Sequence, residues 1–335
     1  MEAEPVKRAA PDPLAQRRSL STEQEVFMHE AAAAAAALRA ADRLGVLAQL
    51  EQGPAGPALI ARTCGISERG ARGLLAALTS LGFADPAGDG TYRSPHPDIA
   101  VISAMVRQWD RLPDLMREDG IEPAADVAAR AQTMYPKVAT RLAAWFAPAA
   151  REAAEMLAAR GLQVLDVGAG AAPWTLALVA RAEGIRVTAV DLPTVIATTR
   201  QAVAAADRRG AFEYLAGDLF TVELRCGAYD LAIVANVCHL FGEDANRRLL
   251  ARLLDALRPG GRLAILDALP DERLEGPRPV LLYALGLLTR TRSGQVYPFS
   301  KYASWLRETG YEAVDRAELG RVPLISLITA RRPAG

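Results

Sequence analysis

A chain of 335 residues is long enough to form two domains, each with its own apolar core. Its 39 basic and 39 acidic side chains cancel, so no global field draws the chain to nucleic acid or to a membrane surface. No apolar run approaches the roughly 20 residues that span a bilayer, and the three cysteines form no CxxC pair. We therefore expect a cytoplasmic protein with neither a disulfide framework nor a metal site.

The N-terminal part is expected to hold a flexible tail and a small helical domain. Residues 1–20 contain three prolines and mixed charges, which is typical of a flexible tail and not of a secretory signal. The capping-box sequence Ser21-Thr-Glu-Gln24 predicts the start of a helix that continues to Leu50. The other elements of residues 21–100 are expected in this order: a helix at Pro57–Cys64, a helix at Ser67–Leu81 and a β wing at Phe83–Arg93.

This order of elements is that of a winged helix, which is common in DNA-binding proteins. Residues 1–100, however, carry 10 basic and 12 acidic side chains, and the helix that would read DNA offers only Arg69 and Arg72 beside Glu68. Because DNA affinity needs several phosphate-neutralising contacts, we do not expect DNA binding. The alternative role is assembly, since the alanines of Ala31–Ala37 let two helices approach closely, although these alanines also favour a helix by propensity alone.

Residues 101–160 are predicted to be helical and to connect this domain to the rest of the chain. At helical spacing, large apolar side chains more often form ordinary core, but a group of them can also line a cavity for a flat, hydrophobic molecule. The side chains in question are Trp109, Met116, Met134, Tyr135, Trp145 and Phe146.

A glycine turn follows the first strand of the C-terminal part. An apolar strand runs into Asp166, Gly168 and Gly170 follow it, and a helix is predicted from Trp174. Such a turn lets the backbone approach a nucleotide-like ligand closely. Pro173 stands where a dinucleotide fingerprint needs its third glycine, so the D-x-G-x-G pattern favours a ligand with an amino group, which Asp166 would hold. A plain tight turn in another α/β protein would look the same.

The next two strands also end in carboxylates. The strand Arg186–Val190 runs into Asp191, which is placed to accept both ribose hydroxyls, with Leu192 beside it. The strand Phe212–Ala216 leads to Asp218, which can accept a hydrogen bond from the amine of adenine while Leu219 or Phe220 packs on the ring. Three acidic strand ends in succession indicate S-adenosylmethionine. Further strands are predicted at Tyr229–Val234, at Arg262–Leu266 after a turn at Arg258–Gly261, and at Tyr311–Arg316 and Val322–Ala330.

The runs VLDVGAG, VTAVDLP, AGDLF and NVCHLFGEDANRRLLARLLDALRPGG resemble class I S-adenosylmethionine-dependent methyltransferases. More narrowly, the chain from about residue 22 to the end resembles small-molecule O-methyltransferases with an N-terminal winged-helix dimerisation domain. The resemblance implies an α/β, Rossmann-like, seven-stranded domain at residues 161–335 with strand order 3-2-1-4-5-7-6. It also implies a homodimer formed through residues 21–100 and a connector that roofs the acceptor pocket. Candidate pocket walls are Met134, Tyr135, Trp145, Tyr283 and Leu287.

His239 is the candidate general base. It lies about five residues past the fourth strand, at the edge where open α/β sheets bind ligands, and histidine is the side chain best suited to take a proton near neutral pH. It resembles the base of the family signature V-x-H-x-x, and Asp267 matches the acidic position that orients that base. Asn236 is placed to touch the amino-acid portion of the cofactor. The alternative is a histidine that only packs.

Two departures from the family pattern keep the reaction open. Leu240 stands where phenol-methylating members commonly have an acidic residue, and Val296 stands about where a second supporting glutamate is expected. The best prediction is methyl transfer to a hydroxyl of a small aromatic or polyketide-like metabolite, with S-adenosylhomocysteine as product and no metal. C-methylation, N-methylation and a cofactor-dependent decarboxylation or pericyclic step remain alternatives.

Overall fold

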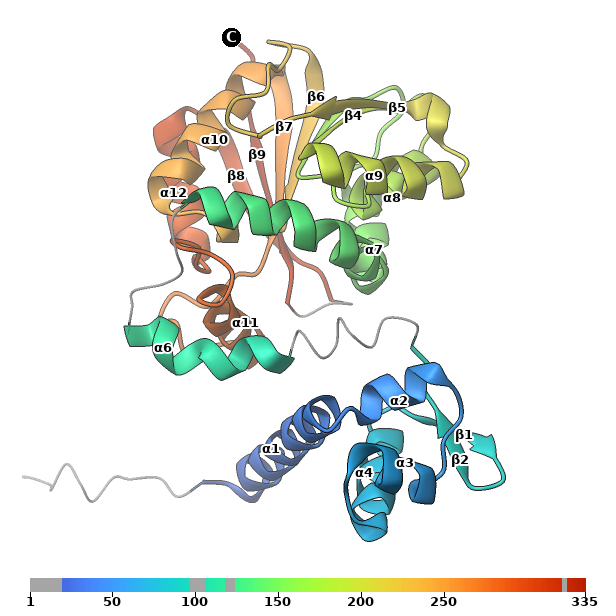
Figure 1. Ribbon diagram of the computed structural model, residues 1–335. Coiled ribbons are helices and arrows are strands. Elements are labelled where there is room, and N and C mark those ends of the chain that lie inside the picture. Colours follow the sequence, from blue (N-terminus) through green and yellow to red (C-terminus); the bar gives the residue numbers. More distant parts are fainter. Residues whose placement is uncertain (1–19, 97–105, 118–123, 321–323) are drawn as a thin grey trace, which may run out of the picture. The chain divides into compact units, whose positions relative to one another are not determined.

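The computed structural model describes residues 20–96, 106–117, 124–320 and 324–335, and it forms two compact units that divide between Arg107 and Gln108 (Figure 1). For residues 124–134 and Lys137 it describes the backbone alone. All but one residue of the predicted tail, 1–20, and the predicted start of the last strand at Val322 lie outside the described residues.

The N-terminal unit contains one long helix, three shorter helices and a two-stranded wing. Its capping box forms as predicted, because Ser21 accepts from the backbone of Gln24 while the Gln24 side chain accepts from Ser21. The isolated bridge between Ala55 and Tyr92 ties the wing to the helices. The elements are α1 (Thr22–Arg43), α2 (Val46–Gln52), α3 (Pro57–Cys64), α4 (Glu68–Ser80), β1 (Asp85–Gly88) and β2 (Thr91–Arg93).

The prediction that the first helix continues to Leu50 is wrong. Helix α1 ends at Arg43, and α2 begins at Val46. Between them Gly45 has φ +76°, a left-handed conformation that glycine adopts without steric cost and that ends an α-helix.

The C-terminal unit is built on a seven-stranded sheet of order β5-β4-β3-β6-β7-β9-β8, which confirms the predicted order 3-2-1-4-5-7-6. Five strands are parallel, and β9 is antiparallel to both of its neighbours. The strands are β3 (Gln163–Val167), β4 (Arg186–Asp191), β5 (Phe212–Ala216), β6 (Tyr229–Ala235), β7 (Leu257–Asp267), β8 (Glu312–Glu318) and β9 (Ser326–Arg331).

Strand β7 is longer than the sequence indicates, and the expected turn at Arg258–Gly261 is part of it. Leu257 already pairs with Tyr229, and the register shifts before the regular pairing resumes at Arg262. Gly260, at φ +76°, absorbs this irregularity. The turn residues therefore form a bulge inside the strand.

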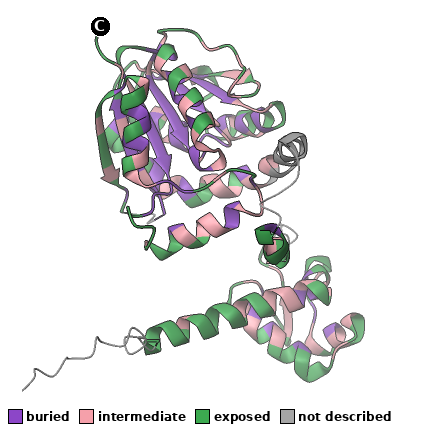
Figure 2. Ribbon diagram, turned by 90° about the vertical axis from the view of Figure 1, so that its left-hand side faces the viewer, coloured by how far each residue is buried: buried purple, intermediate pink, exposed green. Residues whose placement is uncertain are grey.

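Both faces of the sheet are covered, as Figure 2 shows by the buried strands between more exposed helices. Alternate residues of β6 face the two apolar clusters: Leu231 and Ile233 belong to one, Ala232 and Val234 to the other. Helix α7 packs against α8 and α9, and α10 packs against α12. The helices are α6 (Leu112–Arg117), α7 (Ala124–Leu157), α8 (Pro173–Arg181), α9 (Pro193–Ala205), α10 (Glu243–Ala256), α11 (Arg278–Leu287) and α12 (Phe299–Thr309).

Short 3₁₀ turns occupy Gln108–Arg111, Arg209–Ala211 and Cys238–Leu240. Within the described residues no helix is long and apolar enough to cross a membrane.

Candidate active site

The glycine turn after β3 lies at the carboxyl edge of the parallel strands. Gly168 donates its N–H to the carbonyl of Val190 at the end of β4, over 2.9 Å. Its φ is +72°, and a Cβ built there would lie 2.5 Å from Cγ2 of Val237. Gly170 has φ +57°, but a Cβ there would meet no atom within 4 Å. Gly168 is therefore required by packing, whereas Gly170 leaves open space beside the turn.

Asp191 holds this turn. Its two carboxylate oxygens accept from the N–H of Gly170 at 2.8 Å and from that of Leu192 at 2.7 Å. Burial raises the pKa of Asp191, and these two hydrogen bonds act in the opposite direction. The residue as a whole is half-buried.

Asp166 lies deeper than the sequence suggests. It is 1 % exposed, and the hydroxyl of Thr175 donates to its Oδ2 at 2.5 Å. Burial raises the pKa of Asp166 to about 7, although the bond from Thr175 opposes the shift. Its contact with an ammonium group therefore stays a prediction, and Thr175, in the first turn of α8, is a partner that the sequence analysis missed.

The remaining predicted cofactor residues follow β5 and β6 at the same edge. Gly217, after β5, donates to the carbonyl of Asp191 at 2.9 Å, which fixes the loop that presents the exposed Asp218. Leu219 packs against one of the apolar clusters. Asn236 has φ +58°, and its N–H donates to the carbonyl of Leu266 at 2.8 Å.

His239 and Asp267 form a buried pair. The exposed fraction is 2 % for His239 and 0 % for Asp267. Nδ1 of His239 is hydrogen-bonded to Oδ1 of Asp267, and its backbone N–H donates to Oδ2 at 3.1 Å. The N–H of Ala268 also donates to Oδ1, at 2.8 Å. Because Nδ1 faces a carboxylate, it carries the proton, which leaves the lone pair of the imidazole on Nε2.

Two tyrosines extend this pair on either side. The Tyr302 hydroxyl, from α12, donates to Oδ2 of Asp267 at 3.2 Å and is fully buried. The Tyr283 hydroxyl, from α11, lies 2.7 Å from Nε2 of His239, with the two rings edge to face. Burial raises the pKa of Tyr283, so its hydroxyl is the donor to Nε2. From the sequence, Tyr283 is only a candidate pocket wall, and nothing there marks Tyr302 as a partner of Asp267.

Arg290 lies next to Tyr283. Its guanidinium carbon is 4.6 Å from the centroid of the Tyr283 ring. Burial raises the pKa of Tyr135, and the charges of Arg290 and Asp191 also act on it, so Tyr135 lies within electrostatic reach of both. Tyr135 from α7 and Tyr283 from α11 thus both lie within electrostatic reach of Arg290.

The other predicted pocket residues lie elsewhere or cannot be placed. The Met134 side chain lies outside the described residues. Trp145 is 54 % exposed and stacks on Phe146, which in turn stacks on Trp174 in the core. Leu287 is fully buried in the same apolar cluster. Their role as pocket walls remains a prediction.

Gly294, in the loop after α11, lies directly against the backbone of the histidine segment. A Cβ built on it would be 2.5 Å from the carbonyl oxygen of His239 and 2.6 Å from Oγ1 of Thr291. The start of the C-terminal unit also reaches α11, because Thr289 donates to Gln108 at 3.2 Å and Trp109 packs on Gly286.

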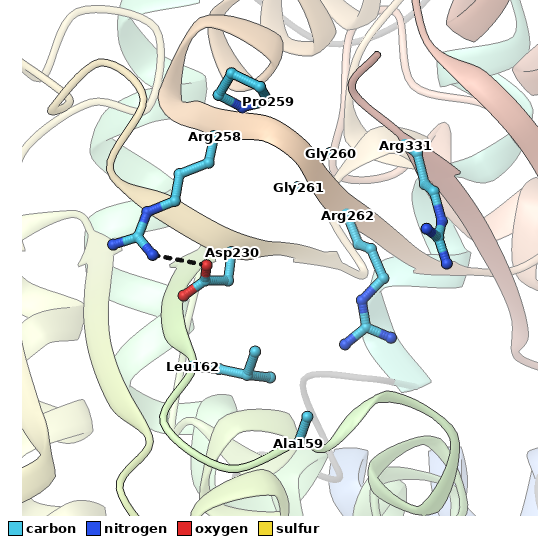
Figure 3. A pocket seen from close by; sticks show the side chains of 9 residues that line it. All are labelled: Ala159, Leu162, Asp230, Arg258, Pro259, Gly260, Gly261, Arg262 and Arg331. Carbon is cyan, nitrogen blue, oxygen red and sulfur yellow. Dashed lines mark hydrogen bonds and ion pairs between the residues drawn. The ribbon is translucent and has the colours of Figure 1, made fainter. Parts of the chain in front are cut away.

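A surface hollow of about 410 Å³ lies at the opposite, amino edge of the sheet (Figure 3). It is lined by the starts of β6 and β7 and the end of β9, with Arg258 paired to Asp230 at 2.8 Å. The predicted site residues gather at the carboxyl edge of the sheet, so this hollow is not part of the candidate site. In the part of the chain that the structure describes, no cluster of three or more His, Cys, Asp or Glu could hold a metal ion.

Comparison with known proteins agrees with this geometry. Residues 129–312 match the family of the O-methyltransferase domain. A 3-hydroxy-5-methyl-1-naphthoate 3-O-methyltransferase of Streptomyces sahachiroi is 30% identical over 300 residues, which cover 83% of this chain and 86% of the relative. The tetracenomycin polyketide synthesis 8-O-methyl transferase TcmO of Streptomyces glaucescens is 28% identical, covering 77% of this chain and 84% of that protein.

Among solved structures, human N-acetylserotonin methyltransferase in complex with SAM has the same fold, with a TM-score of 0.72 and 23% identity over 95% of this chain and 100% of that chain. Taken together, the family match and the naphthoate-methylating relative show that the chain belongs to the O-methyltransferase family. It is an enzyme of that family, whose members use S-adenosylmethionine (SAM) as methyl donor.

The residues of the carboxyl edge fit this donor. Gly170 leaves the side of the turn open, Asp191 is half-buried, and Asp218 is exposed. These are the features that a nucleoside with two ribose hydroxyls and an exocyclic amine requires.

Proposed function

We propose that the enzyme methylates a hydroxyl of a small aromatic or polyketide-like metabolite, with His239 as general base. The observation that carries this proposal is the hydrogen bond of 2.7 Å between Nε2 of His239 and the phenol hydroxyl of Tyr283. A phenol is the kind of group that a phenol O-methyltransferase must deprotonate. The imidazole of His239 is thus oriented to accept a proton from such a group.

The cofactor would be held along the ends of β3, β4, β5 and β6. Asp191 would accept the ribose hydroxyls, with Leu192 beside it, and Asp218 would accept the adenine amine, with Leu219 on the ring. The turn from Gly168 to Gly170 would admit the ribosyl group, and Asp166 and Asn236 would lie nearest the amino-acid portion. When bound, SAM supplies an electrophilic methyl group and leaves as S-adenosylhomocysteine.

The chain's own contribution is to hold the acceptor hydroxyl and to remove its proton at Nε2. Asp267 keeps the proton of the resting imidazole on Nδ1 and lies beside the positive charge that develops when Nε2 is protonated. Tyr302 and the backbone N–H groups of His239 and Ala268 hold that carboxylate in place. Tyr302 therefore supports Asp267 in this chain, in which Val296 stands about where the second supporting glutamate is expected.

The relatives support the choice of acceptor. One of them methylates a hydroxyl of a naphthoate, and another acts in polyketide synthesis. Family membership also favours oxygen over carbon or nitrogen as the methylated atom.

Transfer of labelled methyl from SAM to a panel of naphthols, hydroxynaphthoates and aromatic polyketides tests this function. His239→Ala should lower kcat by about two to four orders of magnitude, which is the usual contribution of a general base, and should leave binding of S-adenosylhomocysteine unchanged. Activity within a few-fold of the parent enzyme would refute the base. A panel that accepts no label while the cofactor binds would refute the acceptor class.

We further propose that the enzyme is a homodimer through its N-terminal unit. Helix α1 spans 22 residues but buries only Ala41, and Val26 and Met28 are at least half exposed (Figure 2). A helix this long gains most of its stability from packing of one face, which another copy of the chain would supply. Light scattering should give twice the chain mass, and Ala33→Glu, on the exposed stretch of α1, should shift the protein to the monomer. A monomeric parent protein would contradict the proposal.

A further inference from the structure

The Tyr283 hydroxyl occupies the position that an acceptor hydroxyl would need. A neutral imidazole has one lone pair, which in His239 lies on Nε2 and already accepts from Tyr283 over 2.7 Å. His239 is 2 % exposed, so no second hydroxyl can reach Nε2 from solvent while Tyr283 stays. Direct deprotonation of an acceptor by His239 therefore requires that the acceptor hydroxyl replaces the Tyr283 hydroxyl.

That exchange affects Arg290. Its guanidinium lies over the Tyr283 ring at 4.6 Å and is half-buried. Within the described residues, no carboxylate forms an ion pair with it. If Tyr283 moves away, Arg290 loses its aromatic neighbour as well. An acceptor that covers this half-buried cation would remove it further from water, which is costly unless the acceptor itself supplies a counter-charge.

We infer that the acceptor is an aromatic hydroxy acid, whose hydroxyl replaces the Tyr283 hydroxyl on His239 and whose carboxylate pairs with Arg290. This inference rests on the proposed function and narrows its acceptor class. A guanidinium binds a carboxylate through two parallel hydrogen bonds, which gives both charge compensation and orientation. A neutral phenol would satisfy Nε2 but would leave Arg290 without a counter-charge.

Two protein carboxylates face the same region. Asp191 acts on Tyr135 together with Arg290, but within the described residues it forms no ion pair with Arg290, and the oxygen lone pairs that its two backbone N–H bonds leave free are those proposed for the ribose. Asp267 acts on Tyr283, but it is bonded to His239 and Tyr302. Within the described residues, neither carboxylate is paired with Arg290. The carboxylate of the cofactor is a further candidate partner, which the experiment must separate from the acceptor.

The experiment measures binding and turnover with hydroxynaphthoate isomers, each paired with its methyl ester. Calorimetry is run on enzyme saturated with S-adenosylhomocysteine. In the parent enzyme the acid should bind at least about tenfold tighter than its ester, which corresponds to about 1.4 kcal/mol, because its carboxylate forms charge-assisted hydrogen bonds with Arg290. Arg290→Gln should abolish the difference, and Arg290→Lys should retain part of it. Arg200→Gln is the matched control, because Arg200 lies 4.1 Å over the Tyr214 ring, outside this cluster.

Three results would overturn the inference: equal affinity for acid and ester in the parent enzyme, no binding of any isomer, or an Arg290→Gln variant that weakens S-adenosylhomocysteine and leaves the acid preference intact. Labelled methyl transfer separates this inference from the proposed function. Equal methylation of acid and ester would refute the inference alone. Arg290-dependent binding of acids without any methyl transfer would refute the proposed function alone.

Discussion

The substitution Asp267→Asn removes the charge beside the imidazole of His239 and preserves the shape of the side chain. An asparagine oxygen can still accept from Nδ1 of His239, but its NH2 group would then face the backbone N–H of His239 and the Tyr302 hydroxyl, which donate to Oδ2 in the parent enzyme. What disappears is the attraction between the carboxylate and the imidazolium that forms as the acceptor loses its proton. The variant therefore removes the charge together with one acceptor oxygen, and Tyr302→Phe measures one of the lost hydrogen bonds separately.

The size of the effect follows from Coulomb's law. Both side chains are almost fully buried, and an effective dielectric constant of about 20 with charge centres about 4 Å apart gives roughly 4 kcal/mol. At about 1.36 kcal/mol per factor of ten, kcat should fall about a thousandfold. Tyr302→Phe removes one neutral donor from the same carboxylate, at 3.2 Å, and leaves the charge. It should cost about 1 kcal/mol, or about fivefold in kcat.

Steady-state kinetics with labelled methyl donor measures both variants, and calorimetry with S-adenosylhomocysteine controls for folding and cofactor binding. Electrostatic support of His239 by Asp267 is refuted if the kcat of Asp267→Asn stays within about threefold of the parent enzyme while His239→Ala is inactive. It also fails if Tyr302→Phe costs as much as Asp267→Asn.

Three more predictions concern the same edge of the sheet. Tyr283→Phe removes the hydroxyl that occupies Nε2 of His239. The KM for the acceptor should therefore fall by about fivefold, which corresponds to about 1 kcal/mol for a neutral hydrogen bond. A tenfold drop in kcat/KM would instead make Tyr283 a proton carrier. Asp191→Ala should weaken S-adenosylhomocysteine in calorimetry by about 10- to 100-fold, from the loss of charge-assisted hydrogen bonds, and an unchanged affinity would remove Asp191 from the cofactor site. Gly168→Ala should lower the free energy of unfolding, measured in urea, more than Gly170→Ala does. Both glycines have positive φ, which costs alanine about 1–2 kcal/mol, but only the Cβ at residue 168 would come within 2.5 Å of Val237. Equal losses would contradict this packing argument.

Much of the sheet could be predicted because its central strands are buried on both faces. Strand β6, for example, is apolar at almost every position, which marks a strand of a covered parallel sheet. The end of α1 could not be predicted from apolar spacing, which continues past Gly45 in α2. Only the backbone conformation of Gly45 separates the two helices.

The candidate site was predictable where residues follow strand ends. His239 and Asp267 are 28 positions apart, and parallel neighbours β6 and β7 bring them to one edge. Tyr302 was missed because a tyrosine on the apolar face of a helix such as α12 resembles ordinary core. Arg290 was missed because it lies in a short polar stretch after α11, and nothing in that stretch indicates that the chain returns to His239.

The close approach of Gly294 to His239 restricts how this enzyme can be redesigned for other acceptors. Any side chain at Gly294 would press on the backbone carbonyl oxygen of His239, so a substitution at this position would displace the imidazole. Laboratory evolution of acceptor range should therefore randomise the face of α11 that carries Tyr283 and leave the glycine untouched.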